Sequence, residues 1–299
     1  MIMPNFVIVG AAKAGTTSLY AYLQQHPQIY LSPVKETNFF AFEREKLDFL
    51  GGINPSYLAD FKTNIYDYRA QFAGVTNEIA IGEASPAYLY LPQAVERIKH
   101  YLADPKIIII LRDPVERAYS HYLHHLRDRL VPHCDFLEAL KLEPERIANN
   151  WWWDYHYVRV GLYYTQVKRY FDNFELQQIK VYLYEELKAN SLALIQDIWQ
   201  FLDVDPQFKP DLSARHNATG IPQNKTIDAL IYEPSVIKTV YQLLPDTIRK
   251  PITAQIAKRN PLKKPSLPEE ARQQIKPLFR EDILKLQELI QLDLSKWLS

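Results

Sequence analysis

Several residue types are scarce in this chain of 299 residues, and each scarcity excludes a class of protein. A single cysteine, Cys134, excludes an internal disulfide framework and is compatible with a reducing compartment. No stretch approaches the roughly 20 apolar residues that a membrane-spanning helix needs, and the start lacks the charged region of a secretory signal. Basic and acidic residues balance at 35 each, which argues against a general nucleic-acid coat. We therefore expect a cytoplasmic protein without a transmembrane segment and without a nucleic-acid polymer as partner.

Glycine is scarce as well, with eight residues against 20 tyrosines. The composition is otherwise that of an ordinary folded chain, with 47% hydrophobic and 23% charged residues. Because so few glycines are present, the position of each one is informative.

The remaining sequence alternates between short apolar runs and helical patterns. Buried strands are predicted over 6–9, 78–82, 107–111 and 180–184, and helices are predicted over 16–25, 114–127 and 163–171. This alternation predicts an α/β fold, a P-loop-containing parallel β-sheet flanked by helices, with a helical C-terminal segment. We expect one domain over 1–299, with a core over about 4–220 and a helical extension over about 226–299.

The first predicted strand runs directly into a glycine loop that ends where the first helix begins. Gly10 and Gly15 have the G-x4-G spacing of a phosphate-binding loop, in which backbone N–H groups and a helix N-terminus converge on an anion. A nucleoside triphosphatase has lysine directly after the second glycine, whereas here Thr16 stands there and the lysine, Lys13, lies inside the loop. The pattern indicates an anion site; a plain strand-to-helix turn is the alternative.

A second basic motif follows the predicted strand over 107–111. Arg112 stands at the C-terminal end of this strand, where open α/β sheets bind their ligands. Arg117 and Ser120 lie three residues apart on the next helix and therefore share a face. Arginine forks and a hydroxyl suit a second phosphate, and structural ion pairs of the arginines with Asp113 or Glu116 are the alternative.

Together the two motifs resemble the sulfotransferases that use 3′-phosphoadenosine 5′-phosphosulfate (PAPS). The segment 4–19 is similar to their 5′-phosphosulfate loop, and 111–122 is similar to their 3′-phosphate motif. The segment 35–40 resembles the part that carries the general base in the heparan-sulfate branch, and 82–89, 161–164 and 184–187 also match family segments. The resemblance covers about 4–220.

This resemblance implies a role for each matched residue. Lys13 would contact the sulfate and the bridging oxygen of PAPS. The other donor-binding positions implied are Ala14, Gly15, Thr16, Thr17 and Ser18 for the 5′-phosphate, Arg112 and Ser120 for the 3′-phosphate, Tyr184 near adenine, and Arg215, His216 and Asn217 in a late closing loop. Heparan-type enzymes often have a lysine after the glutamate that matches Glu83, but here the residue is Ala84.

The acceptor hydroxyl needs a general base, and the sequence offers several. Glu36 is the first choice because it lies in the matching segment, Glu83 competes with it, and His121 and His124 are weaker candidates. The chemistry requires no metal, and the histidines at 121, 124 and 125 are interpreted as a polar helix face. PAPS would be the co-substrate and its desulfated form, PAP, the product.

The sequence is less informative about the acceptor. A carbohydrate is favoured, with a lipid, a small alcohol or an amine as alternatives, and the oligomeric state is open. Trp151, Trp152 and Trp153 would form either a stacking platform or part of the core. A P-loop kinase of nucleosides or small molecules and a non-catalytic nucleotide-binding module are the competing functions.

Overall fold

A sheet of five parallel strands forms the centre of the computed structural model, which describes residues 2–51, 53, 55–128, 130–131, 135–213, 221–222 and 262–299. The strand order is β2-β3-β1-β4-β5, with all neighbours parallel. The strands are β1 (Phe6–Gly10), β2 (Ile29–Leu31), β3 (Ala80–Ala84), β4 (Lys106–Leu111) and β5 (Ile179–Leu183). This confirms the predicted α/β fold; the short strand β2 was not predicted from the sequence.

The two central strands are built from residues that suit complete burial. Every residue of β1 is buried, and the apolar run Ile107–Leu111 of β4 has no exposed area. Branched aliphatic side chains pack well on a pleated surface that is covered on both faces. The sheet core therefore coincides with the strongest apolar runs of the sequence.

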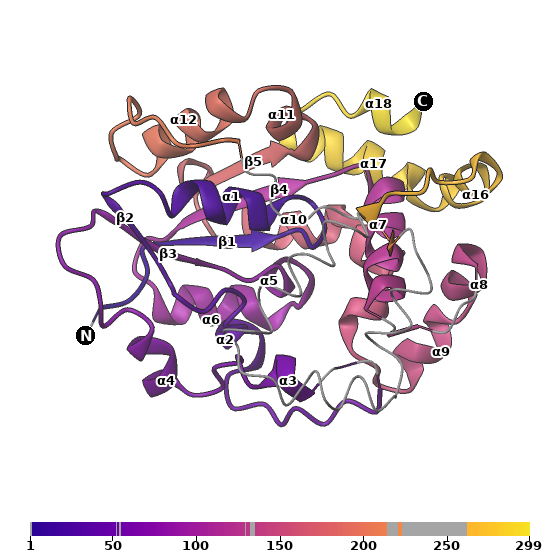
Figure 1. Cartoon of the computed structure of the whole chain (residues 1–299), viewed down its shortest axis with the longest axis horizontal. Helices are drawn as coiled ribbons and strands as arrows, with labels where there is room; N and C mark the ends of the chain where they lie inside the picture. The colour runs from indigo at the N-terminus through magenta and orange to yellow at the C-terminus, as the bar shows by residue number, and fades with distance from the viewer. Residues whose placement is uncertain are drawn as a thin grey trace.

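Helices lie on both faces of the sheet (Figure 1). Helix α1 packs against α12, whereas α5 packs against β1, α6 and α10. The helices before the fourth strand are α1 (Thr16–Leu23), α2 (Phe39–Phe42), α3 (Pro55–Leu58), α4 (Ile65–Ala70), α5 (Ala87–Tyr90) and α6 (Gln93–Tyr101). Those that follow it are α7 (Pro114–Arg127), α8 (Phe136–Lys141), α9 (Glu143–Ala148), α10 (Tyr163–Phe171), α11 (Tyr184–Ala189) and α12 (Ser191–Phe201).

The C-terminal part of the described chain is helical, as predicted. It consists of α16 (Glu269–Ile275), α17 (Pro277–Ile290) and α18 (Ser295–Leu298). Helix α17 packs against α10, where the Asp282 carboxylate accepts the backbone N–H of Tyr164 at 3.1 Å. Two short strands, β6 (Ile221–Pro222) and β7 (Leu262–Lys263), form an antiparallel pair.

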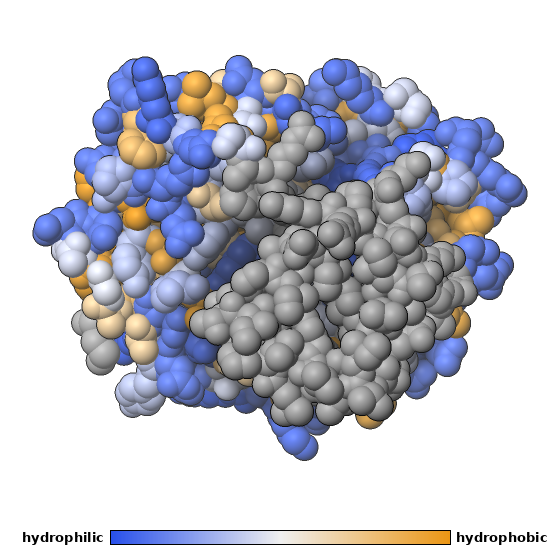
Figure 2. Space-filling model, in the orientation of Figure 1, coloured by the Kyte–Doolittle hydropathy of each residue, from blue (hydrophilic) through white to orange (hydrophobic). Residues whose placement is uncertain are grey.

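Polar and apolar side chains are interspersed over the described part of the face in Figure 2. In the described part of the chain, no helix combines the length and the apolar character that crossing a bilayer would require.

Candidate active site

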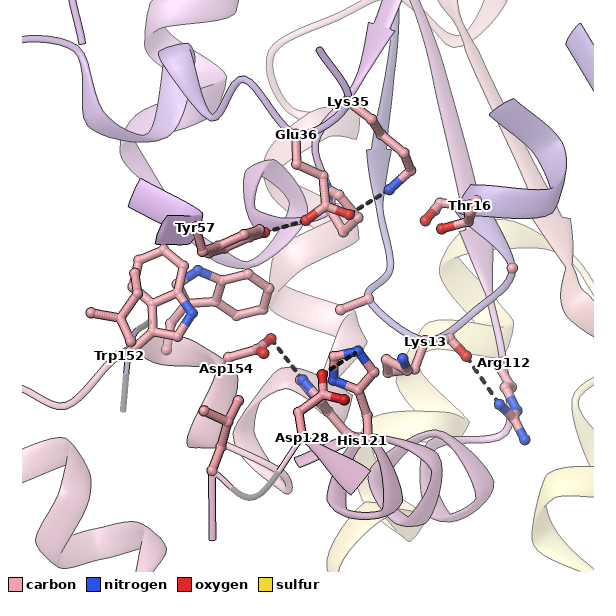
Figure 3. Close-up of a pocket in the computed structure, with 18 of the residues that line it drawn as sticks. Lys13, Thr16, Lys35, Glu36, Tyr57, Arg112, His121, Asp128, Trp152 and Asp154 are labelled. Atoms are coloured by element: carbon pink, nitrogen blue, oxygen red, sulfur yellow. Dashed lines mark hydrogen bonds and ion pairs between the residues drawn. The ribbon is translucent and has the colours of Figure 1, made fainter. Parts of the chain in front are cut away.

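A cavity of about 710 Å³ opens at the carboxyl ends of β1 and β4. The glycine loop and the start of α1 form one side, and Arg112 and Tyr184 adjoin them. Figure 3 shows Glu36, Tyr57, Trp152 and Asp154 on the other side of the cavity, facing Lys13 and Thr16. The sheet topology alone explains the place of the cavity, because ligands of parallel sheets bind outside the carboxyl ends of the strands.

The glycine loop has the strained backbone that an anion cradle requires. Gly15 has a φ of 98°, and a Cβ atom at this position would lie only 2.9 Å from the Tyr184 ring. Lys13 also has a positive φ, of 65°. Helix α1 begins at Thr16, directly after the glycine, so its first N–H groups lie beside the cavity. The predicted residues Gly15, Thr16, Thr17 and Ser18 all line the cavity.

Arg112 connects the second predicted motif to the first. Its Nη1 donates a hydrogen bond of 3.0 Å to the carbonyl oxygen of Lys13, and its guanidinium lies 4.8 Å from the centre of the Tyr184 ring. The guanidinium is also 3.5 Å from a carboxylate oxygen of Glu116. The structure therefore brings Lys13, Arg112 and Tyr184 together around one side of the cavity, as the resemblance implied.

The ammonium group of Lys13 has a pKa close to neutral pH. Burial lowers its pKa to about 8, although the carboxylate of Asp154 acts in the opposite direction. The ammonium is therefore mostly charged at neutral pH, and a bound anion would raise its pKa again. A partly desolvated cation of this kind interacts strongly with negative charge that develops in the cavity.

Glu36 lies in the cavity wall with both carboxylate oxygens engaged. Oε1 accepts a hydrogen bond from the Lys35 ammonium, and Oε2 accepts one from the Tyr57 hydroxyl (Figure 3). Burial acts to raise the pKa of Glu36, but the Lys35 charge and the two hydrogen bonds outweigh it and lower the pKa. Lys35 and Glu36 thus form an ion pair that lines the cavity.

Glu83, the competing carboxylate, is completely buried in β3 and does not line the cavity. Four hydroxyl groups donate to it: Thr37 at 2.9 Å, Tyr68 at 3.0 Å, Ser85 at 2.7 Å and Tyr88 at 2.7 Å. Burial raises its pKa. This environment is that of a structural carboxylate between β3, α4 and α5.

Several other residues of the predicted motifs are buried. Ala14 and Ser120 have no exposed area and are not among the lining residues. Arg117 is also fully buried; its Nη1 lies 3.1 Å from His121 Nδ1, and its Nη2 donates to the carbonyl oxygen of Tyr157. The suggestion that Arg117 helps to hold a second phosphate is therefore wrong, because its fork is used inside the protein.

The histidines of α7 form part of a buried network with Asp154. His121 Nε2 lies 2.6 Å from Asp154 Oδ1, and His125 Nε2 lies 2.9 Å from Asp154 Oδ2. Burial lowers the pKa of His121 to about 3, so its imidazole is neutral near pH 7. The interpretation as a solvated polar face is therefore wrong for His121 and His125, and His121 is unsuited to accept a proton.

The network has the residue types of a metal site, since its three ligand atoms lie within 4.8 Å of one another. The hydrogen bonds indicate another arrangement. Arg117 can only donate, so His121 Nδ1 must accept and Nε2 must carry the proton. An N–H group directed at Asp154 is not a metal ligand.

Sequence reasoning missed much of the wall opposite the glycine loop. Tyr57, Asp128 and Asp154 line the cavity, but no motif marked them. Trp152 and Trp153 line it as well while being almost fully buried, so they belong to the core, and the role of a stacking platform stays a prediction.

Some predicted positions lie outside the described residues. These are Cys134 and the late-loop residues Arg215, His216 and Asn217.

Comparison with known proteins agrees with this geometry. A family model described as a sulfotransferase domain matches residues 3–229. A solved sulfotransferase structure from Alicyclobacillus acidocaldarius is 34% identical, and the similarity covers 100% of both chains with a TM-score of 0.78.

Curated relatives match over less of the chain. Carbohydrate sulfotransferase 15 of Mus musculus is 26% identical over 68% of this chain and 44% of its own length. Bifunctional heparan sulfate N-deacetylase/N-sulfotransferase 4 of Mus musculus is 24% identical over 69% of this chain and 23% of its own length. The membrane-associated sulfotransferase kil1 of Dictyostelium discoideum is 36% identical over 41% of this chain and 23% of its own length. The chain thus spans less than half the length of these curated relatives.

The family match covers most of the chain, and the solved relative is 34% identical over all of it. This protein therefore belongs to the sulfotransferase family.

Proposed function

We propose that this protein transfers the sulfuryl group of PAPS to a hydroxyl group of an acceptor, with Lys13 stabilising the leaving group and Glu36 acting as general base. The observation that carries the proposal is the placement of both side chains in one cavity, beside a glycine loop and Arg112. Relatives that are named as carbohydrate and heparan sulfate enzymes favour a carbohydrate acceptor.

In the proposed reaction the acceptor oxygen attacks sulfur, and the bond from sulfur to the bridging phosphate oxygen breaks. Negative charge then grows on the leaving phosphate of PAP, where the Lys13 ammonium and the N–H groups of the loop would oppose it. Such stabilisation acts where charge develops and therefore lowers the barrier rather than only strengthening binding.

The acceptor hydroxyl loses its proton in the same step, and Glu36 would take it. Its low pKa keeps the carboxylate ionised near neutral pH and so able to accept. The Lys35 and Tyr57 hydrogen bonds fix its orientation. The buried position of Glu83 gives no comparable access to an acceptor.

For donor binding, Thr16, Thr17 and the loop N–H groups would hold the 5′-phosphate, and Arg112 would hold the 3′-phosphate. The Tyr184 ring, which lies under the Arg112 guanidinium, offers a surface for adenine. The kinase alternative is disfavoured by the family match and by the absence of lysine after Gly15.

Two measurements test the proposal. PAP should raise the melting temperature of the protein more than ADP with magnesium does. Labelled PAPS should then transfer its sulfuryl group to at least one member of a broad acceptor panel, as read by mass spectrometry. Stronger stabilisation by ADP with magnesium would support a kinase, and binding of PAP without any transfer would support a non-catalytic module.

A further inference from the structure

Acidic side chains dominate the part of the cavity wall that does not belong to the donor side. Among the described lining residues outside the glycine loop and Arg112, four are carboxylates and one, Lys35, is an ammonium; the carboxylates are Glu36, Asp60, Asp128 and Asp154. His121 and His124 add no positive charge near pH 7, because burial lowers their pKa to about 3 and about 4. Among the described residues, this part of the wall therefore has more acidic than basic side chains, with Arg127 paired to Asp128 beside it.

Asp154 differs from the other carboxylates because buried histidines hold it. The proton of His121 stands on Nε2, since Arg117 donates to Nδ1, and it is donated to Asp154 Oδ1. An ionised carboxylate only accepts, so His125 also donates from Nε2, to Oδ2, and its Nδ1 accepts from the Tyr157 hydroxyl. Each oxygen of Asp154 thus has one fixed donor from the protein interior.

The other side of this carboxylate faces the cavity. The Asp154 side chain is 23% exposed, whereas those of His121 and His125 are 1% and 0% exposed. Figure 3 shows Asp154 in the cavity below Glu36 and Tyr57, with Lys13 on the other side. A carboxylate oxygen accepts more than one hydrogen bond, so Asp154 retains acceptor capacity on the side of a bound ligand.

Trp153 carries a hydrogen-bond donor, its indole N–H group, whereas Asp154 carries acceptor oxygens. It lines the same cavity, and its buried indole Nε1 has no hydrogen-bond partner among the described residues. A hydroxyl group can both donate to a carboxylate and accept from an N–H donor, whereas a carboxylate or sulfate group can only accept. An acceptor hydroxyl can therefore donate to Asp154, whereas an anionic group cannot.

We propose that Asp154 binds the acceptor by accepting hydrogen bonds from its hydroxyl groups, and that the acidic wall selects uncharged, hydroxyl-rich acceptors over anionic ones. The inference rests on the proposed function and adds the charge class of the acceptor. His121 and His125 are positioning residues in this arrangement, because they act on the acceptor through Asp154. An anionic acceptor beside these carboxylates would bind weakly for two reasons. The like charges repel each other, and both groups lose water without gaining a partner of opposite charge.

The experiment compares two acceptors of equal length, neutral N-acetylchitohexaose and an anionic hyaluronan hexasaccharide, with PAPS as donor. The wild-type protein should transfer to the neutral sugar with the higher kcat/KM. Asp154→Asn should raise the KM for the neutral sugar by about 10- to 100-fold, as the loss of a hydrogen bond to a charged group does. The KM for PAPS should change far less when it is measured well below pH 8, where Lys13 stays charged even though the loss of the Asp154 charge lowers its pKa.

Asp128→Asn is the matched control, since it removes the same charge from the same cavity. Asp128 is paired with Arg127 at 2.6 Å, and its histidine contact, with His124 at 3.5 Å, is longer than either histidine contact of Asp154. The Asp128→Asn variant should lower the ratio of kcat/KM for the neutral sugar to that for the anionic sugar. It should raise the KM for the neutral sugar far less than Asp154→Asn does.

Each result has a defined meaning. Equal or better transfer to the anionic hexasaccharide by the wild-type protein would overturn the inference. So would an Asp154→Asn variant in which kcat falls with both sugars while the ratio of their kcat/KM values stays the same. Either result would leave sulfuryl transfer established. A stoichiometric transition metal in the purified protein that is lost in Asp154→Asn would also overturn it. Absence of both PAP binding and PAPS turnover would instead overturn the proposed function.

Discussion

Arg112 donates a hydrogen bond of 3.0 Å from Nη1 to the main-chain oxygen of Lys13, across 99 residues of sequence. The contact joins the two strand ends at which the two anion motifs stand, β1 and β4, which are direct neighbours in the sheet. It uses only part of the guanidinium fork, so the arginine can position the loop and still present N–H groups to a ligand. One side chain would therefore link the shape of the loop to the proposed binding of the 3′-phosphate.

Arg112→Gln and Arg117→Gln should therefore affect different properties, donor binding in the first variant and stability in the second. Arg112→Gln should raise the KM for PAPS by about 10- to 100-fold, because a charged hydrogen-bond donor to phosphate is lost. Arg117 is fully buried, so Arg117→Gln should lower the free energy of unfolding by about 1.5–3 kcal/mol. Steady-state kinetics and chemical denaturation separate the two effects. A variant of Arg112 with normal donor KM would remove this residue from the donor site.

Replacing Lys13 by alanine should reduce kcat strongly and leave the fold intact. The ammonium lies where negative charge is expected to develop, and loss of one such group typically costs about 10²–10³ in rate. The measurement is single-turnover transfer from labelled PAPS, with thermal unfolding as the control for folding. Loss of rate in parallel with loss of stability would mean that Lys13 shapes the loop rather than the transition state.

A matched pair of amide substitutions distinguishes the two candidate bases, Glu36 and Glu83. Glu36→Gln should abolish transfer while PAP still binds, because the amide cannot accept the proton of the acceptor. Glu83→Gln should lower the free energy of unfolding by about 1–3 kcal/mol instead. The amide N–H₂ group is a donor, and it would face hydroxyl groups that donate to the carboxylate in the wild-type protein. Nearly normal activity in Glu36→Gln would transfer the role of base to another group.

The donor side of the site could be predicted because its residues are contiguous with strong strands. Gly10 to Thr17 directly follow a fully buried apolar run, and Arg112 directly follows another. Parallel strands end at one edge of the sheet, so adjacency to a strand end translates into adjacency in space. Asp113 accepts from the N–H groups of Val115 and Glu116 and fixes the start of α7 at residue 114, as predicted.

The acceptor side could not be predicted in this way. Tyr57 reaches Glu36 from a separate helix, and Asp154 reaches the histidines of α7 from the segment after α9. Tertiary packing alone decides such contacts, and neither residue belongs to a periodic or glycine-marked pattern. Strand β3 illustrates the same limit on the fold, since it begins two residues later than predicted, at Ala80, where its pairing with Ile29 of β2 starts.

The last prediction concerns the pH dependence of transfer. Burial lowers the pKa of Lys13 to about 8, so the free enzyme holds a charged ammonium below this pH and loses it above. The kcat/KM for PAPS reports the free enzyme and should therefore fall above about pH 8, approaching a tenfold loss per pH unit. The kcat reports the complex, in which the anionic donor raises the pKa of Lys13, so its decline should begin at higher pH.

Lys13→Arg provides the control for this profile. The guanidinium stays protonated throughout the measured range, so the alkaline fall in kcat/KM should disappear even though the variant is slower. Persistence of the same fall in Lys13→Arg would assign it to another group, and an identical onset for kcat and kcat/KM in the wild-type protein would show that the bound donor does not interact with the Lys13 ammonium.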